Sequence, residues 1–232
     1  MILSGWAEFA GALVVFMASH FLPRWGGLRE TLIGKIGRRL YFTGYGIVSL
    51  VVLLWLIGSA SRAPFVELWA ASEWTRKVPG ILMPFAMVLA VIGVGTHSPF
   101  TLGSKGAKAL DPATPGLAAL TRHPLLWALA LWSASHLPPN GDLAHVLLFG
   151  GFAGMSLAAM PMFDGRAKNA IASDDAVRAF QAAPVLSLAP LFDPTWLIEN
   201  RRDLAWRLAV AVAIWAAAYG LHSDVIGVSP IS

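Results

Sequence analysis

Residues 41–60 read YFTGYGIVSLVVLLWLIGSA, twenty positions without a charged side chain. A helix rises about 1.5 Å per residue, so about twenty apolar residues cross the hydrocarbon core of a bilayer, which is roughly 30 Å thick. This run therefore predicts a membrane-spanning helix.

The composition extends that prediction to the whole chain. Of its 232 residues, 56% are hydrophobic and only 13% are charged. A soluble domain is nearer 45–50% apolar and about 25% charged, so an ordinary soluble domain and a disordered chain are both excluded. About 130 apolar residues would suffice for six spans of about twenty each.

Six apolar runs fit that number. They cover residues 6–23, 41–60, 79–96, 124–137, 142–162 and 204–221. The fold class expected is all-α, an integral membrane six-helix bundle that forms a single domain over residues 1–232. The sequence Pro-Pro-Asn-Gly-Asp at 138–142 predicts a tight turn with Asp142 as helix cap, so spans four and five should form an antiparallel hairpin.

The fifth loop, residues 163–203, is the longest connection. Residues 173–183 begin with Ser-Asp-Asp and predict a short surface helix. An apolar strip follows, which we expect either to lie against the membrane or to pack under the bundle; it contains Leu186, Leu188, Leu191 and Phe192.

The distribution of cations predicts the orientation. Of the 17 Lys and Arg residues, 14 lie in or beside loops one, three and five, whereas Arg62, Arg76 and Lys77 alone lie in loop two. Cytoplasmic loops carry the excess of Lys and Arg, so loops one, three and five, including 163–203, should be cytoplasmic and both termini outside. The same placement explains the formal charge of +4 without nucleic acid.

The chain has no cysteine, which limits its chemistry. Disulfides, thiolate nucleophiles, iron–sulfur clusters, thiolate-ligated haem and covalent c-type haem are excluded. A metal or cofactor would have to be held by His, Met, carboxylate or backbone groups.

Four of the six histidines have a structural interpretation. Three lie near predicted membrane interfaces, where burying a half-polar ring costs little free energy: His97, His145 and His222. In Arg122-His123-Pro124 the proline suits the start of a helix, so the motif is either a helix start or a site for an anion or substrate, with Arg122 and His123 at the positive helix end. Asp164 we expect to be a solvated loop charge or part of a local ion pair.

His20 and His136 lie among apolar residues, within spans one and four. Polar groups at membrane depth are costly, which makes them functional candidates. Imidazole is the usual ligand of haem b, so two histidines on an iron are the natural option in a helical bundle without cysteine. A methionine could be the alternative axial ligand: Met155, Met160 or Met162.

Several motifs resemble the NnrU family over nearly the whole chain. They are Ser19-His20, Leu28-Arg29-Glu30, Arg39-Leu40-Tyr41, Thr121-Arg122-His123-Pro124, Leu131-Trp132-Ser133-Ala134-Ser135-His136-Leu137, Asn140-Gly141-Asp142 and Ala218-Tyr219-Gly220-Leu221-His222. The resemblance implies a bacterial inner-membrane protein associated with denitrification and nitric-oxide handling, with an apolar small molecule or nitric-oxide reductase components as partners besides the bilayer.

The family also includes the plant 15-cis-zeta-carotene isomerase, which carries haem b between two histidines. The resemblance implies that those ligands correspond to His20 and His136. That isomerase has a cysteine three residues before its second ligand, where this chain has Ser133, so a switch to a thiolate ligand is not open to it.

Membrane depth leaves the second ligand open. Counted from Leu3 at 1.5 Å per residue, His20 lies about 25 Å from the outer face, whereas His136 lies close to that face. His123, near the cytoplasmic face, matches the depth of His20 better. The resemblance favours His136 and simple geometry favours His123.

Two other functions stay open, and with them whether the chain is an enzyme. One is a non-catalytic membrane factor that assembles or regulates a partner. The other is a membrane methyltransferase of the isoprenylcysteine type, suggested by Arg122-His123-Pro124; there the motif usually continues to a tyrosine, whereas Leu125 and Leu126 follow here.

Overall fold

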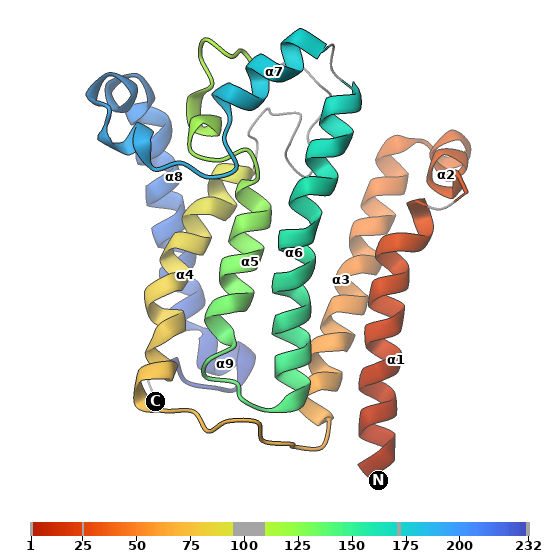
Figure 1. Ribbon diagram of the computed structural model, residues 1–232. Helices are drawn as coiled ribbons and strands as arrows, with labels where there is room; N and C mark the ends of the chain where they lie inside the picture. Colours follow the sequence, from red (N-terminus) through yellow and green to blue (C-terminus); the bar gives the residue numbers. More distant parts are fainter. Residues whose placement is uncertain (1, 25, 95–109, 171–172, 231–232) are drawn as a thin grey trace. The chain divides into compact units, whose positions relative to one another are not determined.

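The computed structural model describes residues 2–24, 26–94, 110–170 and 173–230, and the regular elements of that part are helices joined by loops (Figure 1). His97, Lys105, Lys108 and the end of the third predicted span lie outside the described residues. The helices are α1 (Ile2–Phe21), α2 (Leu28–Ile36), α3 (Arg38–Arg62), α4 (Glu73–Gly93), α5 (Pro124–His136), α6 (Leu143–Ala170), α7 (Ser173–Ala182), α8 (Pro194–Gly220) and α9 (His222–Ile226). Short 3₁₀ turns are η1 (Leu22–Arg24), η2 (Gly116–Ala119) and η3 (Ala189–Phe192).

Within the described residues, four helices are long and apolar enough to cross a membrane, namely α3, α4, α6 and α8. They confirm the all-α membrane class and correspond to four of the six predicted spans. The other two predicted spans are also helices, α1 with 20 residues and α5 with 13. At 1.5 Å per residue α5 is only about 20 Å long, shorter than the hydrocarbon core.

Helices α4, α6 and α8 extend furthest beyond the predicted spans, and capping groups rather than apolar side chains set the starts of α4 and α8. The Asp193 side chain accepts from the N–H groups of Thr195 and Trp196, so α8 begins ten residues before the predicted start at 204. A capping box between Ser72 and Thr75 starts α4 before Pro79, which therefore lies inside the helix. Helix α6 continues to Ala170 rather than ending at 162.

The chain forms two compact units, of which the first comprises residues 1–69 and 141–148. In this unit α1 packs against α3 (Figure 1). Glu8 on α1 accepts hydrogen bonds from Arg62 and Trp55 on α3, with Arg62 Nη2 at 2.6 Å and Trp55 Nε1 at 3.4 Å. Asp142 caps α6 as predicted, since its Oδ1 accepts the His145 N–H at 3.2 Å.

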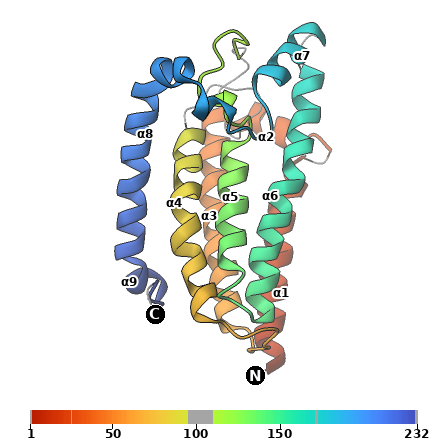
Figure 2. The same cartoon turned by 60° about the vertical axis from the view of Figure 1, so that its left-hand side comes forward.

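The second unit comprises residues 70–140 and 149–232. Here α4 lies between α5 and α8 (Figure 2). The end of α4 approaches the start of α5 so closely that a Cβ on Gly93 would lie 2.4 Å from Leu125 Cγ. Arg207 of α8 is 8% exposed and donates to the carbonyls of Val91, Ile92 and Val94. It thereby gives hydrogen-bond partners to carbonyl groups that the end of α4 leaves unpaired.

Helices α5 and α6 are antiparallel in this unit, as the predicted hairpin requires. Arg122, just before α5, contacts Asp164 near the end of α6, whereas His136, at the other end of α5, stacks on Phe149. The short helix predicted over residues 173–183 is confirmed as α7, which ends one residue earlier, at Ala182.

Large apolar side chains face outward in both units. On α3 the exposed fractions of Ile47, Val51 and Leu54 are each 60%. The strip after α7 is also exposed, up to 83% at Phe192, so it favours the membrane over packing under the bundle. Soluble proteins rarely expose such continuous apolar surface, which is what lipid would cover.

Candidate functional site

The ring of His20 is held by its own helix near the end of α1. His20 Nδ1–H donates to the Phe16 carbonyl, four residues earlier, at 2.8 Å. The Ser19 hydroxyl donates to the same carbonyl at 2.7 Å and lies 3.2 Å from Nδ1. The ring of Phe16 covers the imidazole, with centroids 4.4 Å apart, and Tyr45 of α3 meets its edge at 6.3 Å.

His136 repeats this arrangement at the end of α5. Its Nδ1–H donates to the Trp132 carbonyl at 2.7 Å, while the Ser135 hydroxyl donates to that carbonyl at 2.8 Å and lies 3.1 Å from Nδ1. The imidazole stacks on Phe149 of α6 at 5.3 Å and lies beside Trp132 at 5.6 Å. Both histidines are half-buried.

These contacts fix the tautomer of both rings. A carbonyl oxygen only accepts, so Nδ1 carries the proton and Nε2 keeps its lone pair. Among the described residues of its own unit, neither Nε2 has a hydrogen-bond partner. An imidazole whose Nδ1–H is held by a carbonyl and whose Nε2 is available is the usual form of a metal-bound histidine, so both residues fit a haem iron.

The structure does not bring all the predicted site residues together. His123 and His136 lie at opposite ends of α5, about 20 Å apart along the helix axis, so one haem cannot have both as ligands. His20 belongs to the first unit and both others to the second, so its pairing with either one stays a prediction.

Arg122 and His123 instead form a cluster with Asp164. Arg122 binds the carboxylate through two parallel hydrogen bonds, Nε to Oδ1 at 2.9 Å and Nη2 to Oδ2 at 2.7 Å. His123 Nε2–H donates to Oδ1 at 2.9 Å, and its side chain is fully buried. Asp164 was expected to be a solvated loop charge or part of a local ion pair. Its side chain is instead only 16% exposed, lies inside α6, and pairs with residues 41 and 42 positions away in the sequence.

The cluster also binds the segment that follows α7. Arg122 Nη1 donates to the Ala183 carbonyl at 2.9 Å, and its backbone N–H donates to the Pro184 carbonyl at the same distance. The guanidinium stacks over Phe180 at 4.8 Å. Because Asp164 already neutralises Arg122, an anion at this end of α5 would have to compete with a bidentate carboxylate.

The family model described as NnrU protein matches residues 8–230 of the chain. The chain belongs to the NnrU family. No curated protein and no solved structure matches it.

The remaining candidate ligands of this NnrU protein have local roles. His145 Nδ1 lies 2.7 Å from the carboxylate of Asp142, and His222 Nδ1 lies 2.6 Å from the Val228 carbonyl. Met160 is buried at 5% exposure, which indicates packing, while Met162 is 46% exposed. Across the described ranges no three His, Asp or Glu side chains gather as a metal-binding group.

Sequence reasoning missed two features of the NnrU chain. The first is the likeness of residues 16–20, FMASH, to residues 132–136, WSASH, which places an aromatic residue four positions before each histidine. A comparison of the two segments would have found it. The second is the partnership of Asp164, which the lack of any other acid between residues 143 and 173 could have suggested.

Proposed function

We propose that this member of the NnrU family is an integral protein of the bacterial inner membrane that binds haem b through His20 and His136. The observation that carries the proposal is the geometry shared by the two rings. Each Nδ1–H is held by the carbonyl four residues earlier, with a serine hydroxyl on the same oxygen, and each Nε2 is left available.

The contacts of His123 support His136 as the second ligand. His123 uses Nε2–H to bind Asp164, and iron binding at Nε2 would require that hydrogen bond to be given up. His136 has no such competitor among the described residues of its unit. A haem that joins His20 and His136 must be strongly tilted if the two rings lie at the depths that the sequence predicts.

The chain's own residues would hold and orient the group. Bound haem b would supply one-electron redox chemistry or polarise an apolar substrate. Phe16 and Phe149 pack on the faces of the two imidazoles, which restricts rotation of each ring. Ser133 is fully buried and donates to the Leu129 carbonyl at 2.8 Å, so it acts as a packing residue where the plant isomerase has cysteine.

The family resemblance supports the wider role. We place the protein in denitrification or nitric-oxide metabolism, with redox or isomerase-like chemistry on an apolar substrate. Helices α1 and α5 complete a six-span bundle in this proposal, with both termini outside the cytoplasm.

An absorption spectrum of the purified protein tests the cofactor. After expression with ample haem, wild type should show a Soret band typical of six-coordinate, bis-histidine haem. His20→Ala and His136→Ala should each lose that band or shift it to a five-coordinate form, whereas His123→Ala and the matched control His145→Ala should keep it. Absence of a Soret band in wild type, or an unchanged spectrum in His20→Ala and His136→Ala, rejects the proposal.

A complementation assay separates catalysis from a scaffolding role. The His20→Ala/His136→Ala double variant should lose function at normal abundance. Full function in that variant would instead identify a non-catalytic assembly or regulatory factor.

A further inference from the structure

Cations gather where α2 meets α3. Helix α2 and the first two residues of α3 carry four cations and one acid, Glu30; the cations are Arg29, Lys35, Arg38 and Arg39. Within the part of the chain that the structure describes, no carboxylate forms an ion pair with any of the four. This corner therefore carries uncompensated positive charge.

Phe42 holds two of these cations near each other. The guanidinium carbon of Arg29 lies 5.2 Å from the ring centroid, and that of Arg38 lies 5.0 Å from it. Both lie within the roughly 6 Å range of a cation–π interaction, which favours these positions. Two like charges held by one ring repel each other, so an anion between or beside them would be attracted to both.

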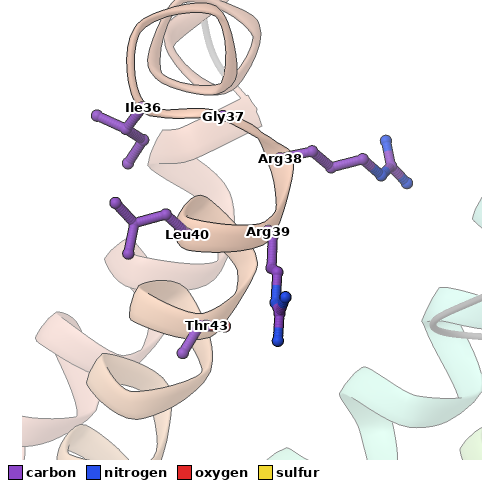
Figure 3. Close-up of a pocket in the computed structure, with 6 residues that line it drawn as sticks. All are labelled: Ile36, Gly37, Arg38, Arg39, Leu40 and Thr43. Carbon is purple, nitrogen blue, oxygen red and sulfur yellow. The ribbon is translucent and has the colours of Figure 1, made fainter.

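A shallow depression of about 420 Å³ opens where α2 meets α3 (Figure 3). Six residues line it, two of them arginines: Ile36, Gly37, Arg38, Arg39, Leu40 and Thr43. Ile36 and Leu40 project to one side of the helix start and Arg38 to the other (Figure 3). Leu40 is 62% and Ile36 47% exposed, so the side of the helix start opposite Arg38 presents an apolar surface.

With α3 spanning the bilayer, as its length and composition allow, the depression would lie at the membrane surface. Arg38 is the first residue of α3, one of the candidate spans, and the apolar run of that helix starts a few residues later. Gly37, with φ of 83°, turns the chain between α2 and α3, and no residue of α2 is buried. Lipid phosphates lie at this level, and acyl chains would lie beside the exposed leucine and isoleucine.

We propose that the α2–α3 corner binds the headgroup of an anionic phospholipid. The guanidinium groups of Arg38 and Arg39 hold the phosphate, Phe42 positions Arg38 and Arg29, and Leu40 contacts the lipid chains. This inference does not depend on haem binding.

Thermal unfolding of the full-length protein in neutral detergent tests the site. Added phosphatidylglycerol should raise Tm in a concentration-dependent way and more than phosphatidylcholine does. The Arg38→Gln/Arg39→Gln variant should need roughly tenfold more phosphatidylglycerol for the same shift. The matched control Arg76→Gln/Lys77→Gln, which removes the same charge from α4, should respond like wild type.

A second variant keeps all four cations and removes the aromatic ring that contacts two of them. Phe42→Leu should weaken the response to phosphatidylglycerol although every cation remains. Equal shifts with the two lipids, or a wild-type response in the Arg38→Gln/Arg39→Gln variant, would overturn the proposal. The same shift with inorganic phosphate alone would also overturn it, because the site would then bind an ion and not a lipid.

Discussion

Asp164 accepts from Arg122 and His123 in a part of the molecule where all three side chains are largely withdrawn from solvent, at 16%, 11% and 0% exposure. A carboxylate and a guanidinium removed from water stabilise a fold only while they remain together. The cluster therefore joins the start of α5 to α6, and through Arg122 to the segment after α7.

Asp164→Asn should destabilise the protein because the variant leaves Arg122 without its counter-charge. A loss of about 3 kcal/mol in the free energy of unfolding is expected. Thermal unfolding in detergent micelles measures it, with Glu199→Gln, an exposed carboxylate on α8, as control. Equal unfolding temperatures in Asp164→Asn and Glu199→Gln would contradict the assigned role.

Ser135 shares the Trp132 carbonyl with His136, so its hydroxyl should tune the proposed haem. Without it, the carbonyl accepts from Nδ1–H alone, which strengthens that bond and makes the imidazole a better electron donor. Ser135→Ala should therefore lower the midpoint potential of bound haem, as should Ser19→Ala at His20. Spectroelectrochemical titration measures the shift.

Ser133→Ala is the matched control for the potential. Its hydroxyl donates to the Leu129 carbonyl on the same helix and is not hydrogen-bonded to His136. It should leave the potential unchanged; a shift as large as that of Ser135→Ala would show that the effect is not specific to the ligand's hydrogen bond.

At the scale of the helix, the contact between α4 and α5 depends on a missing side chain. Gly93→Ala would bring a Cβ to 2.4 Å from Leu125 Cγ and 3.1 Å from the Leu125 backbone nitrogen. We expect a loss of about 1–3 kcal/mol in the free energy of unfolding, since backbone cannot move aside as a side chain can.

Gly80 provides the comparison within the same helix. A Cβ there would meet nothing within 4 Å, so Gly80→Ala should be neutral or slightly stabilising through its helix propensity. The denaturation midpoint should therefore fall below that of wild type in Gly93→Ala and stay equal or rise slightly in Gly80→Ala. A Gly93→Ala variant as stable as Gly80→Ala would refute the close packing of α4 on α5.

The helices show where sequence reasoning succeeds and fails. Uncharged runs such as residues 41–60 identify spans, because burial in lipid requires apolar side chains over the whole length. They do not identify helix ends: α8 starts at Pro194, in a polar stretch, because Asp193 caps it. The end of a helix depends on where backbone N–H and C=O groups find partners, and some partners are distant, as Arg207 is for α4.

For the whole molecule, the asymmetry of Lys and Arg predicts the orientation, and the absence of native cysteine makes it easy to test. In spheroplasts, a membrane-impermeant maleimide should label Ala70→Cys and Ser223→Cys. It should label Ala113→Cys and Ala189→Cys only after lysis. The reverse pattern would place the termini in the cytoplasm.

The candidate site was only partly accessible from the sequence. Apolar neighbours in the sequence and the family resemblance single out His20 and His136. The orientation of each ring, however, depends on a carbonyl four residues earlier, which every helical histidine has. Only the structure shows that these two use it, whereas His123 turns its Nε2 to Asp164. Side-chain rotamers and contacts across 41 residues are set by packing, which a single sequence does not display.

The pairing of Glu8 with Arg62 has a consequence for biogenesis. The two residues are 54 positions apart, so Glu8 leaves the ribosome well before its counter-ion is synthesised. A carboxylate entering lipid without a partner is expensive, and Arg62 appears only as α3 is completed. If α1 crosses the membrane, as we propose, the translocon should therefore release α1 and α3 together, with Glu8 and Arg62 already paired, rather than one helix after the other.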